Sequence, residues 1–227
     1  MTLRDSAAII VAAGAGTRFG SAVPKQFLTL NGSPVFLWSV RAFRRTGLFS
    51  QIIVVVPASR LKRMEPQARR HAFMLAPGGV ERYDSVRAGL ALLDPHIKYV
   101  AIHDGARPLV SPRAIADGLA AARRKGASVV AVPARDTVKY SRRAGVVSET
   151  IPRSAVWLAQ TPQTFRRSII ERAYARRPRR VTDDAQVVEA MGLPVAIVPG
   201  DHSNIKITDR NDLAIAHVLL RKGASHK

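Results

Sequence analysis

The stretch Ala7-Ala8-Ile9-Ile10-Val11-Ala12-Ala13-Gly14-Ala15-Gly16-Thr17-Arg18-Phe19-Gly20 decides the fold class. Its apolar first half is typical of a strand buried on both faces, and the glycines follow where that strand opens into a loop. Ligands of α/β sheets bind at such strand ends. Gly14 and Gly16 let backbone N–H groups approach a ligand, and Arg18 and Lys25 add two cations, which favours a polyphosphate.

Two familiar phosphate-binding motifs do not fit this loop. A P-loop ends in Gly-Lys-Ser/Thr, whereas Lys25 is followed by Gln26. A dinucleotide fingerprint is G-x-G-x-x-G with a carboxylate about 20 residues later. Here the last glycine comes one residue late, and no Asp or Glu occurs between Asp5 and Glu65. The loop therefore favours a nucleoside triphosphate held by cations, although the glycines by themselves are equally compatible with a tight turn.

Composition limits the class of protein. The 227 residues carry 36 Lys and Arg against 16 Asp and Glu, a formal charge of +20, which calls for acidic partners and leaves a nucleic-acid-binding protein as the alternative from a different class. Because only 6% of residues are aromatic and no reading module is recognisable, we expect no nucleic-acid partner. No apolar run is long enough to predict a membrane span, and the chain has no cysteine, so we expect a soluble, cytoplasmic protein.

Strand and helix patterns alternate, which predicts an α/β fold: a mostly parallel sheet with helices on both faces, in a single domain over 1–227. Helices are expected from Val35 up to Gly47 and over 59–71, 85–93, 112–125, 168–175, 184–191 and 212–222. Strands are expected over 7–13, 51–56, 73–75, 98–103, 128–132, 195–198 and 205–208.

A hairpin is predicted to leave this sheet. The segments 137–140 and 146–150 flank a polar, basic turn at 141–145. An isolated two-stranded hairpin is marginal in water. We therefore expect this arm, at about 134–156, to lie against a partner subunit.

Asp104 places a carboxylate at the carboxyl end of the strand expected over 98–103, on the same sheet edge as the glycine loop. A triphosphate arrives with Mg²⁺, a hard cation that takes oxygen ligands, so Asp104 is the natural protein ligand. The alternative is an Asp that caps the following turn. For His103 beside it, a packed side chain is the favoured interpretation.

Lys206 lies in the short apolar strand expected over 205–208. Burying a lysine is costly unless it faces an anion, which indicates a phosphate contact, and the alternative is a surface lysine on an edge strand. Asp209 is interpreted as the cap of the last helix rather than a metal ligand, and Thr182-Asp183 as an N-cap.

Several motifs occur in order along the chain. They are Ala-Ala-Gly-x-Gly-x-Arg with Pro24-Lys25-Gln26, Glu81–Val86, His103–Pro108, Arg135–Lys139, Thr161-Pro162-Gln163 and Asn204–Thr208. Taken together, the chain closely resembles the 2-C-methyl-D-erythritol 4-phosphate cytidylyltransferases over essentially its whole length. A cytidylyltransferase for another alditol phosphate, such as ribitol 5-phosphate, stays open as the alternative.

The resemblance implies transfer of CMP from CTP to methylerythritol phosphate, giving the CDP-linked alcohol and pyrophosphate in the non-mevalonate route to isoprenoids. It also implies a Rossmann-like nucleotidyltransferase fold, Mg²⁺ dependence, and a homodimer in which the arm of one subunit completes the site of the other.

The resemblance implies roles for individual residues as well. Arg18 and Lys25 match transition-state stabilisers, and Arg153 and Lys206 match residues that position the attacking phosphate. The further substrate contacts are Thr137, Arg107 and Thr182. The nucleotide-binding positions are Ala13, Gly14, Ala15, Gly16, Gly79, Ser85 and Asp104, of which Asp104 is the Mg²⁺ ligand.

Two positions depart from the family pattern, with Gly105 where Ala is usual and Pro152 where Asp is usual. Neither removes a charged contact, although Pro152 stiffens the approach to Arg153. These variants resemble the form fused to a downstream cyclodiphosphate synthase. Because the chain is too short to contain that domain, we expect a free-standing enzyme or the separated half.

Overall fold

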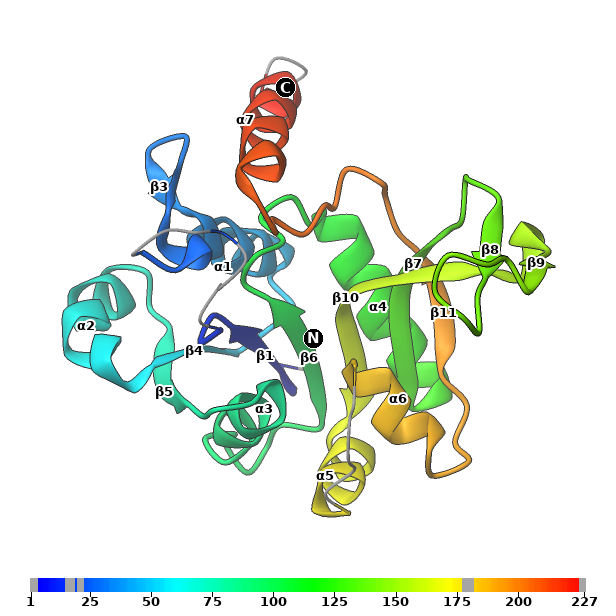
Figure 1. Ribbon diagram of the computed structural model, residues 1–227. Coiled ribbons are helices and arrows are strands. Elements are labelled where there is room, and N and C mark those ends of the chain that lie inside the picture. The colour runs from blue at the N-terminus through cyan, green and yellow to red at the C-terminus, as the bar shows by residue number, and fades with distance from the viewer. Residues whose placement is uncertain (1–3, 15–18, 20–22, 177–181, 225–227) are drawn as a thin grey trace.

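The computed structural model describes residues 4–14, 19, 23–176 and 182–224. Its main sheet has seven strands in the order β11-β7-β10-β6-β1-β4-β5 (Figure 1). These strands are β1 (Ser6–Val11), β4 (Gln51–Pro57), β5 (Met74–Gly78), β6 (Tyr99–Asp104), β7 (Ala127–Pro133), β10 (Trp157–Arg166) and β11 (Ala196–Pro199). Only β10 is antiparallel to its neighbours among these strands, which confirms a mostly parallel sheet.

Helices cover both faces of this sheet (Figure 1). They are α1 (Val35–Thr46), α2 (Leu61–Arg70), α3 (Arg82–Leu90), α4 (Pro112–Lys125), α5 (Arg167–Ala175) and α6 (Asp184–Glu189). A further helix, α7 (Arg210–Ala224), packs instead against the β2–β3 region. Shorter elements are the 3₁₀ turns η2 (Lys25–Phe27), η3 (Ala58–Arg60) and η4 (Arg153–Ala155) and the two-strand pairs β2 (Thr29–Leu30) with β3 (Ser33–Pro34) and β8 (Val138–Tyr140) with β9 (Glu149–Ile151). The α/β class is therefore confirmed.

The alternation along β1 builds two hydrophobic layers. Ala7 and Ile9 pack into the core under α3, α5 and α6, whereas Ala8 and Ile10 pack into the core under α1, α2 and α4. All four side chains are fully buried, as a strand in the middle of a covered parallel sheet requires. Burial of each isoleucine contributes about 1.5–3 kcal/mol, so β1 is anchored on both faces.

The ends of the helices follow local sequence rules. Ser111 caps α4 by accepting a hydrogen bond from Ala114 N at 3.1 Å, and Pro112 takes the first turn. Gly126 ends that helix in the left-handed region at φ 90°, and Gly47 ends α1 in the same way at φ 67°. The helix expected over 112–125 has these same bounds in the structure.

Two expectations about strands were wrong. Residues 205–208 form no strand, and Ile207 makes a single backbone hydrogen bond to Ala106 O at 2.8 Å. Its apolar pattern reflects packing against α7 and the β2–β3 region. Conversely, β10 escaped sequence analysis because its centre, Gln160 to Gln163, is polar and contains a proline. The pairing of β10 with β7 shifts register at this point.

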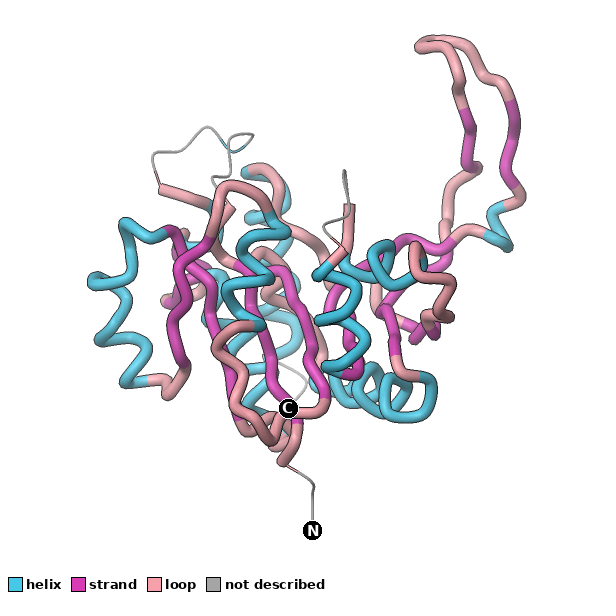
Figure 2. The backbone as a smooth tube through the Cα atoms, turned by 90° about the horizontal axis from the view of Figure 1, so that it is seen from below, coloured by secondary structure: helices cyan, strands magenta, loops and turns pink. Residues whose placement is uncertain are grey.

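The order of the strands creates a crevice. β1 lies between β4 and β6. The chain therefore passes from β1 to a strand on one side of it, β4, and later returns to a strand on its other side, β6. Ligands of α/β sheets bind at this switch point, beyond the carboxyl ends of the strands. The hairpin β8–β9 stands clear of the sheet, as the arm in Figure 2 shows. Among the described residues, no helix is long and apolar enough to cross a membrane.

Candidate active site

A cavity of about 460 Å³ opens at the carboxyl edge of the sheet, beside the ends of β1 and β6. Seven of its lining residues are site candidates from the sequence: Ala13, Gly14, Lys25, Gly79, Ser85, Asp104 and Lys206. The remaining lining residues are Val11, Gln26, Val80, Glu81, Arg82 and Ala106. Segments from the two ends of the chain therefore meet at one site.

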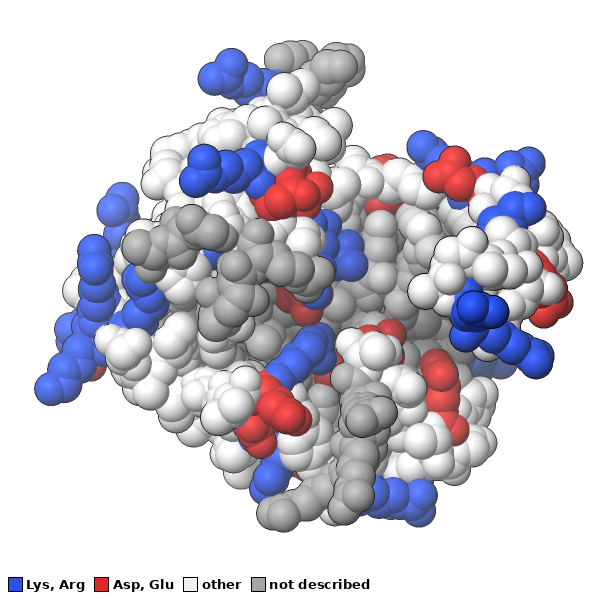
Figure 3. All heavy atoms as spheres, viewed as in Figure 1, with Lys and Arg blue, Asp and Glu red and all other residues white. Residues whose placement is uncertain are grey.

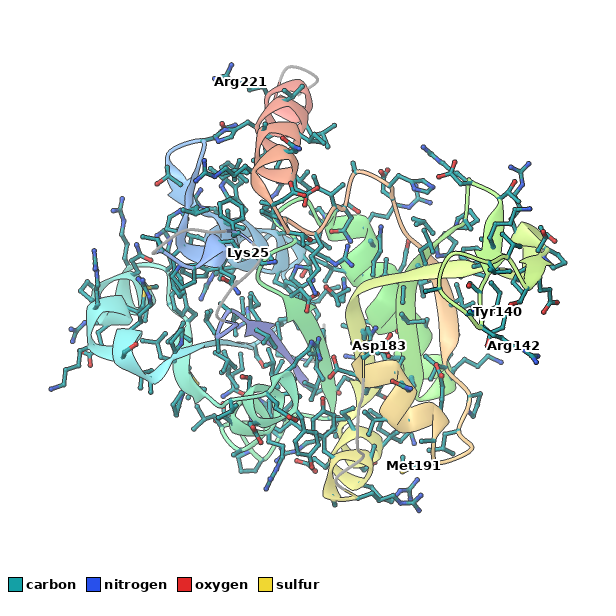
Figure 4. The ribbon with its side chains drawn as sticks, in the orientation of Figure 1. Lys25, Tyr140, Arg142, Asp183, Met191 and Arg221 are labelled. Carbon is teal, nitrogen blue, oxygen red and sulfur yellow. The ribbon has the colours of Figure 1, made fainter. Side chains whose placement is uncertain are left out.

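Lys25 reaches this cavity from η2, just after the glycine loop. It is only 8% exposed, although it is a lysine. Its neighbour Gln26 donates a hydrogen bond to Gly14 O at 3.2 Å, which fastens η2 to the described part of the loop. Figure 4 shows Lys25 in the body of the molecule, near the end of β1 and far from the arm.

Gly78, the last residue of β5, and Gly79 lie too close to neighbouring side chains to carry a Cβ. A Cβ on Gly78 would lie 2.1 Å from the Cβ of Ala13, and one on Gly79 would lie 2.2 Å from the Cβ of Asp84. Side chains are therefore excluded at both positions. The next helix, α3, begins with a capping box between Glu81 and Asp84, which places buried Ser85 in the cavity wall.

Asp104 sits at the end of β6 among three cations. Its Oδ2 lies 2.7 Å from Lys206 Nζ and 3.8 Å from Arg107 Nε. Its Oδ1 accepts a hydrogen bond from Arg82 Nη2 at 3.2 Å. Lys206 is exposed rather than buried in a strand, and its ammonium group pairs with this carboxylate, so the phosphate contact stays a prediction.

These contacts keep Asp104 ionised. Burial alone would raise the pKa of its carboxyl group, but the adjacent Arg82 guanidinium, then Lys206 and Arg107, outweigh burial and hold that pKa well below its ordinary value. For Arg107, burial dominates and lowers the pKa, while Asp104 opposes the change. Asp104 thus carries a negative charge at the cavity, and the three cations around it make the local net charge positive.

Arg82 is a lining residue that was not among the site candidates from the sequence. Its Nη1 donates to both carboxylate oxygens of Asp184, at 2.6 and 2.7 Å, while its Nη2 reaches Asp104. The side chain of Asp184 is completely buried and also accepts a hydrogen bond from the Tyr174 hydroxyl. Arg82 therefore bridges α6 to the end of β6. Arg82 lies in the motif Glu81–Val86, and this is the sequence signal that could have identified it as a site residue.

Other predicted site residues lie outside the cavity lining. Arg107 lies beside it, where its Nη1 donates to Asn204 O at 2.8 Å. Thr182 is exposed, and its N and Oγ1 both donate to Gln186 Oε1. Thr137 and Arg153 belong to the arm region, and Arg153 Nη1 donates to Arg135 O at 2.8 Å. Arg18, Ala15 and Gly16 lie outside the described residues.

The residues interpreted as structural behave as such. Asp183 caps α6 by accepting a hydrogen bond from Gln186 N at 2.9 Å, and Asp209 accepts from Asp212 N at 3.0 Å at the start of α7. His103 is fully buried in the packed interior. Figure 3 shows Lys and Arg spread around the visible surface, with acidic and basic atoms meeting in the central hollow.

A mostly parallel sheet with this strand order, and a cation-lined cleft at its carboxyl edge, fit a nucleotidyltransferase of Rossmann-like fold, which is the fold of the solved relatives. The crystal structure of 4-diphosphocytidyl-2C-methyl-D-erythritol synthase from Anaerococcus prevotii is similar, with a TM-score of 0.85 and 29% identity over 96% of this chain and 99% of that one. Residues 6–222 match the family model for 2-C-methyl-D-erythritol 4-phosphate cytidylyltransferase. The chain belongs to this family.

Two curated relatives extend the comparison. The 2-C-methyl-D-erythritol 4-phosphate cytidylyltransferase of Endomicrobium trichonymphae is 43% identical over 95% of this chain and 99% of its own length. The bifunctional enzyme IspD/IspF of Desulfotalea psychrophila is 37% identical over 97% of this chain, which spans 58% of that longer protein. The curated relatives thus include a fused form, and the likeness of Gly105 and Pro152 to that form stays a prediction.

Proposed function

We propose that this protein transfers CMP from CTP to 2-C-methyl-D-erythritol 4-phosphate, with 4-CDP-2-C-methyl-D-erythritol and pyrophosphate as products, in isoprenoid precursor synthesis. One observation carries the proposal: in a chain of this family, Lys25, Lys206 and Asp104 converge in one cavity at the carboxyl edge of the sheet. Residues 1–227 act as one domain in this proposal.

The reaction needs alignment and charge neutralisation more than proton transfer. An oxygen of the acceptor phosphate forms a bond to the α-phosphorus of CTP, the bond from that phosphorus to the bridging oxygen breaks, and pyrophosphate leaves with the electron pair. A phosphate oxygen is already a nucleophile, so no general base is required. Lys25 and Lys206 neutralise charge that builds on the phosphates, and Arg18, by match to the family, does the same.

Asp104 is the residue that would hold Mg²⁺. Its carboxylate is ionised and lines the cavity. Mg²⁺ typically binds one or two carboxylates together with substrate phosphates, so a single protein carboxylate fits this ion. No group of three or more candidate ligands occurs among the described residues, which is consistent with sharing the ion with the nucleotide. When bound, Mg²⁺ would neutralise phosphate charge.

The arm supports a homodimer in this proposal. The hairpin β8–β9 is exposed over most of its length, with Tyr140, Val146 and Val147 each about half exposed or more. An isolated hairpin of this kind is marginal in water. We infer that it packs on a second copy of the chain and delivers Thr137 and Arg153 to that copy's acceptor phosphate. CTP, the proposed donor, is abundant in the cytoplasm, where we place the reaction.

Pyrophosphate release tests the function directly. The protein is incubated with CTP and Mg²⁺ and with either methylerythritol phosphate or ribitol 5-phosphate. Release that requires methylerythritol phosphate supports the proposal, and release with ribitol 5-phosphate alone supports the alternative acceptor. Absence of release with both, combined with tight binding of DNA or RNA that CTP does not displace, would favour the nucleic-acid-binding alternative.

A further inference from the structure

Thr161, in the middle of β10, touches the turn that carries Asp104. Its Oγ1 lies 3.0 Å from the backbone N of Asp104 and 3.0 Å from Nδ1 of His103. The other ring nitrogen of His103, Nε2, lies 3.1 Å from Arg107 O. The Thr161 hydroxyl and the imidazole therefore connect the first residue of the turn to its last through buried groups.

The direction of each hydrogen bond in this chain follows from its ends. Arg107 O can only accept, so Nε2 of His103 carries a proton. The ring is fully buried, and a neutral imidazole has a single N–H, so Nδ1 is an acceptor. Thr161 therefore donates its single hydroxyl proton to Nδ1 and uses a lone pair to accept from the N–H of Asp104. Every donor in this series of hydrogen bonds has an acceptor.

The same turn is held from other directions. Arg107 N donates to Asp104 O at 2.9 Å, which closes the turn, and Gly105 N donates to Val11 O at the end of β1. Asn204 Nδ2 donates to Thr161 O at 3.0 Å, so the segment that leads to Lys206 is fixed to the same threonine. Thr161 thus helps to hold both the Asp104 carboxylate and the Lys206 ammonium group in position.

We propose that Thr161 and His103 are positioning residues for the transfer reaction, which set the Asp104–Arg107 turn so that the cleft charges align with the reacting phosphates. This inference rests on the proposed function. Neither side chain lines the cavity, and both act through the backbone they hold. A misplacement of about 1 Å at a reacting centre costs roughly 100-fold in rate, so a small movement of this turn suffices for a large effect.

The test compares two threonines of one strand. Thr161→Val removes the hydroxyl without changing shape, Thr161→Ser keeps it, and Thr164→Val is the matched control. Thr164 is also fully buried on β10, but its Oγ1 has no hydrogen-bond partner among the described residues. Steady-state kcat and KM for CTP are measured at a temperature at which circular dichroism shows all variants folded.

We expect Thr161→Val to lower kcat about 10- to 100-fold, with KM for CTP changed less than about threefold, because the cations that grip the triphosphate remain. Thr161→Ser and Thr164→Val should retain kcat within about threefold of wild type. Equal kcat for the two valine variants would overturn the proposal, as would a Thr161→Ser variant no better than Thr161→Val.

A second measurement does not depend on turnover. Two-dimensional ¹H–¹⁵N NMR of histidine-labelled protein at neutral pH reports which ring nitrogen carries the proton, and His103→Asn identifies the signal. We expect the neutral Nε2–H tautomer in the wild type. An Nδ1–H tautomer would overturn the hydrogen-bond chain. A wild-type protein that shows this tautomer but no transfer would defeat the proposed function and, with it, the role in positioning.

Discussion

The cleft and the arm differ in how completely one chain builds them. In the cleft, Asp104 is buried among Arg82, Arg107 and Lys206, of which Arg82 and Lys206 come from distant parts of the sequence. In the arm, β8 and β9 pair only with each other among the described residues, and most of their side chains are exposed. Figure 4 shows this separation, with Tyr140 and Arg142 on the arm and Lys25 in the body.

This difference shows that the cleft is preorganised within one subunit and the arm is not. The cleft holds its charges in place before any ligand arrives, because folding of the sheet brings its strand ends together. Arg153 instead contacts a carbonyl of its own arm, Arg135 O. Its proposed role depends on a surface that another copy of the chain supplies. Changes in the cleft should therefore act within one subunit, and changes in the arm should act across two.

The largest effect is expected from Lys25→Ala in the cleft. We expect kcat to fall about 10²- to 10³-fold with the fold intact, because one charge-stabilising donor is lost. Steady-state pyrophosphate release measures kcat, and thermal unfolding checks the fold. Lys62→Ala, at an exposed position of α2, is the control and should leave kcat unchanged. Near-normal turnover by Lys25→Ala would remove Lys25 from the mechanism.

A mixing experiment tests whether the cleft acts within one subunit and the arm acts on the other. We expect Arg153→Ala alone to lower kcat/KM for the acceptor at least about tenfold, because a phosphate contact is lost. When Lys25→Ala and Arg153→Ala proteins are mixed and their subunits exchange, half of the dimers are hybrids with one intact site. Activity should then recover to about a quarter of the wild-type value.

The mixture distinguishes the two geometries without a dimer structure. If both residues served the same subunit, every site in a hybrid would carry one substitution, and mixing would restore nothing. The control is a mixture of Lys25→Ala with Lys206→Ala protein, since both side chains line one cavity. Recovery in the control mixture, or none in the test mixture, would contradict the assignment of the arm to the partner.

Acid should weaken the cleft more than the arm. Since the pKa of Asp104 is below its ordinary value in the folded state, its ion pairs stabilise the fold above about pH 4 and lose this contribution as the pH falls further. We expect Asp104→Asn to lower the free energy of unfolding by about 1–3 kcal/mol at pH 7.

The difference from wild type should shrink below about pH 4. Urea unfolding at several pH values measures it. Asp117→Asn, which breaks an exposed ion pair with Arg113, should change the free energy of unfolding by less than about 1 kcal/mol. A wild-type advantage over Asp104→Asn that grows on acidification would contradict the sign of the pKa change.

Sequence was sufficient for the parts of the cleft that follow a periodic pattern. The buried strand β1, the helix α4 and the carboxylate at the end of β6 are each set by local residues, and parallel strand ends meet at one edge by topology. The ordered motifs assigned Lys25 and Lys206 to the same site because both match site residues of the family. These interpretations needed no knowledge of side-chain contacts.

The rest depends on contacts between distant polar groups, which no local pattern encodes. In the polar centre of β10, Asn204, Asp183 and His103 are among the distant residues that make hydrogen bonds to its buried side chains and carbonyls. Arg82 gains its role from Asp184, which lies 102 residues further along the chain. The apolar pattern at 205–208 predicted a strand because burial against α7 produces the same alternation.

The smallest effect is expected at the apolar side chains of the arm. Val147 is 59% exposed, so Val147→Ser should change the free energy of unfolding of a single subunit by less than about 0.5 kcal/mol. The same change at Val55, which is fully buried in β4, should cost several times more. If the arm packs on a second copy, Val147→Ser should raise the dimer dissociation constant, which analytical ultracentrifugation measures. An unchanged dissociation constant would place Val147 outside the interface and move the search for the partner surface to Thr137 and Arg153.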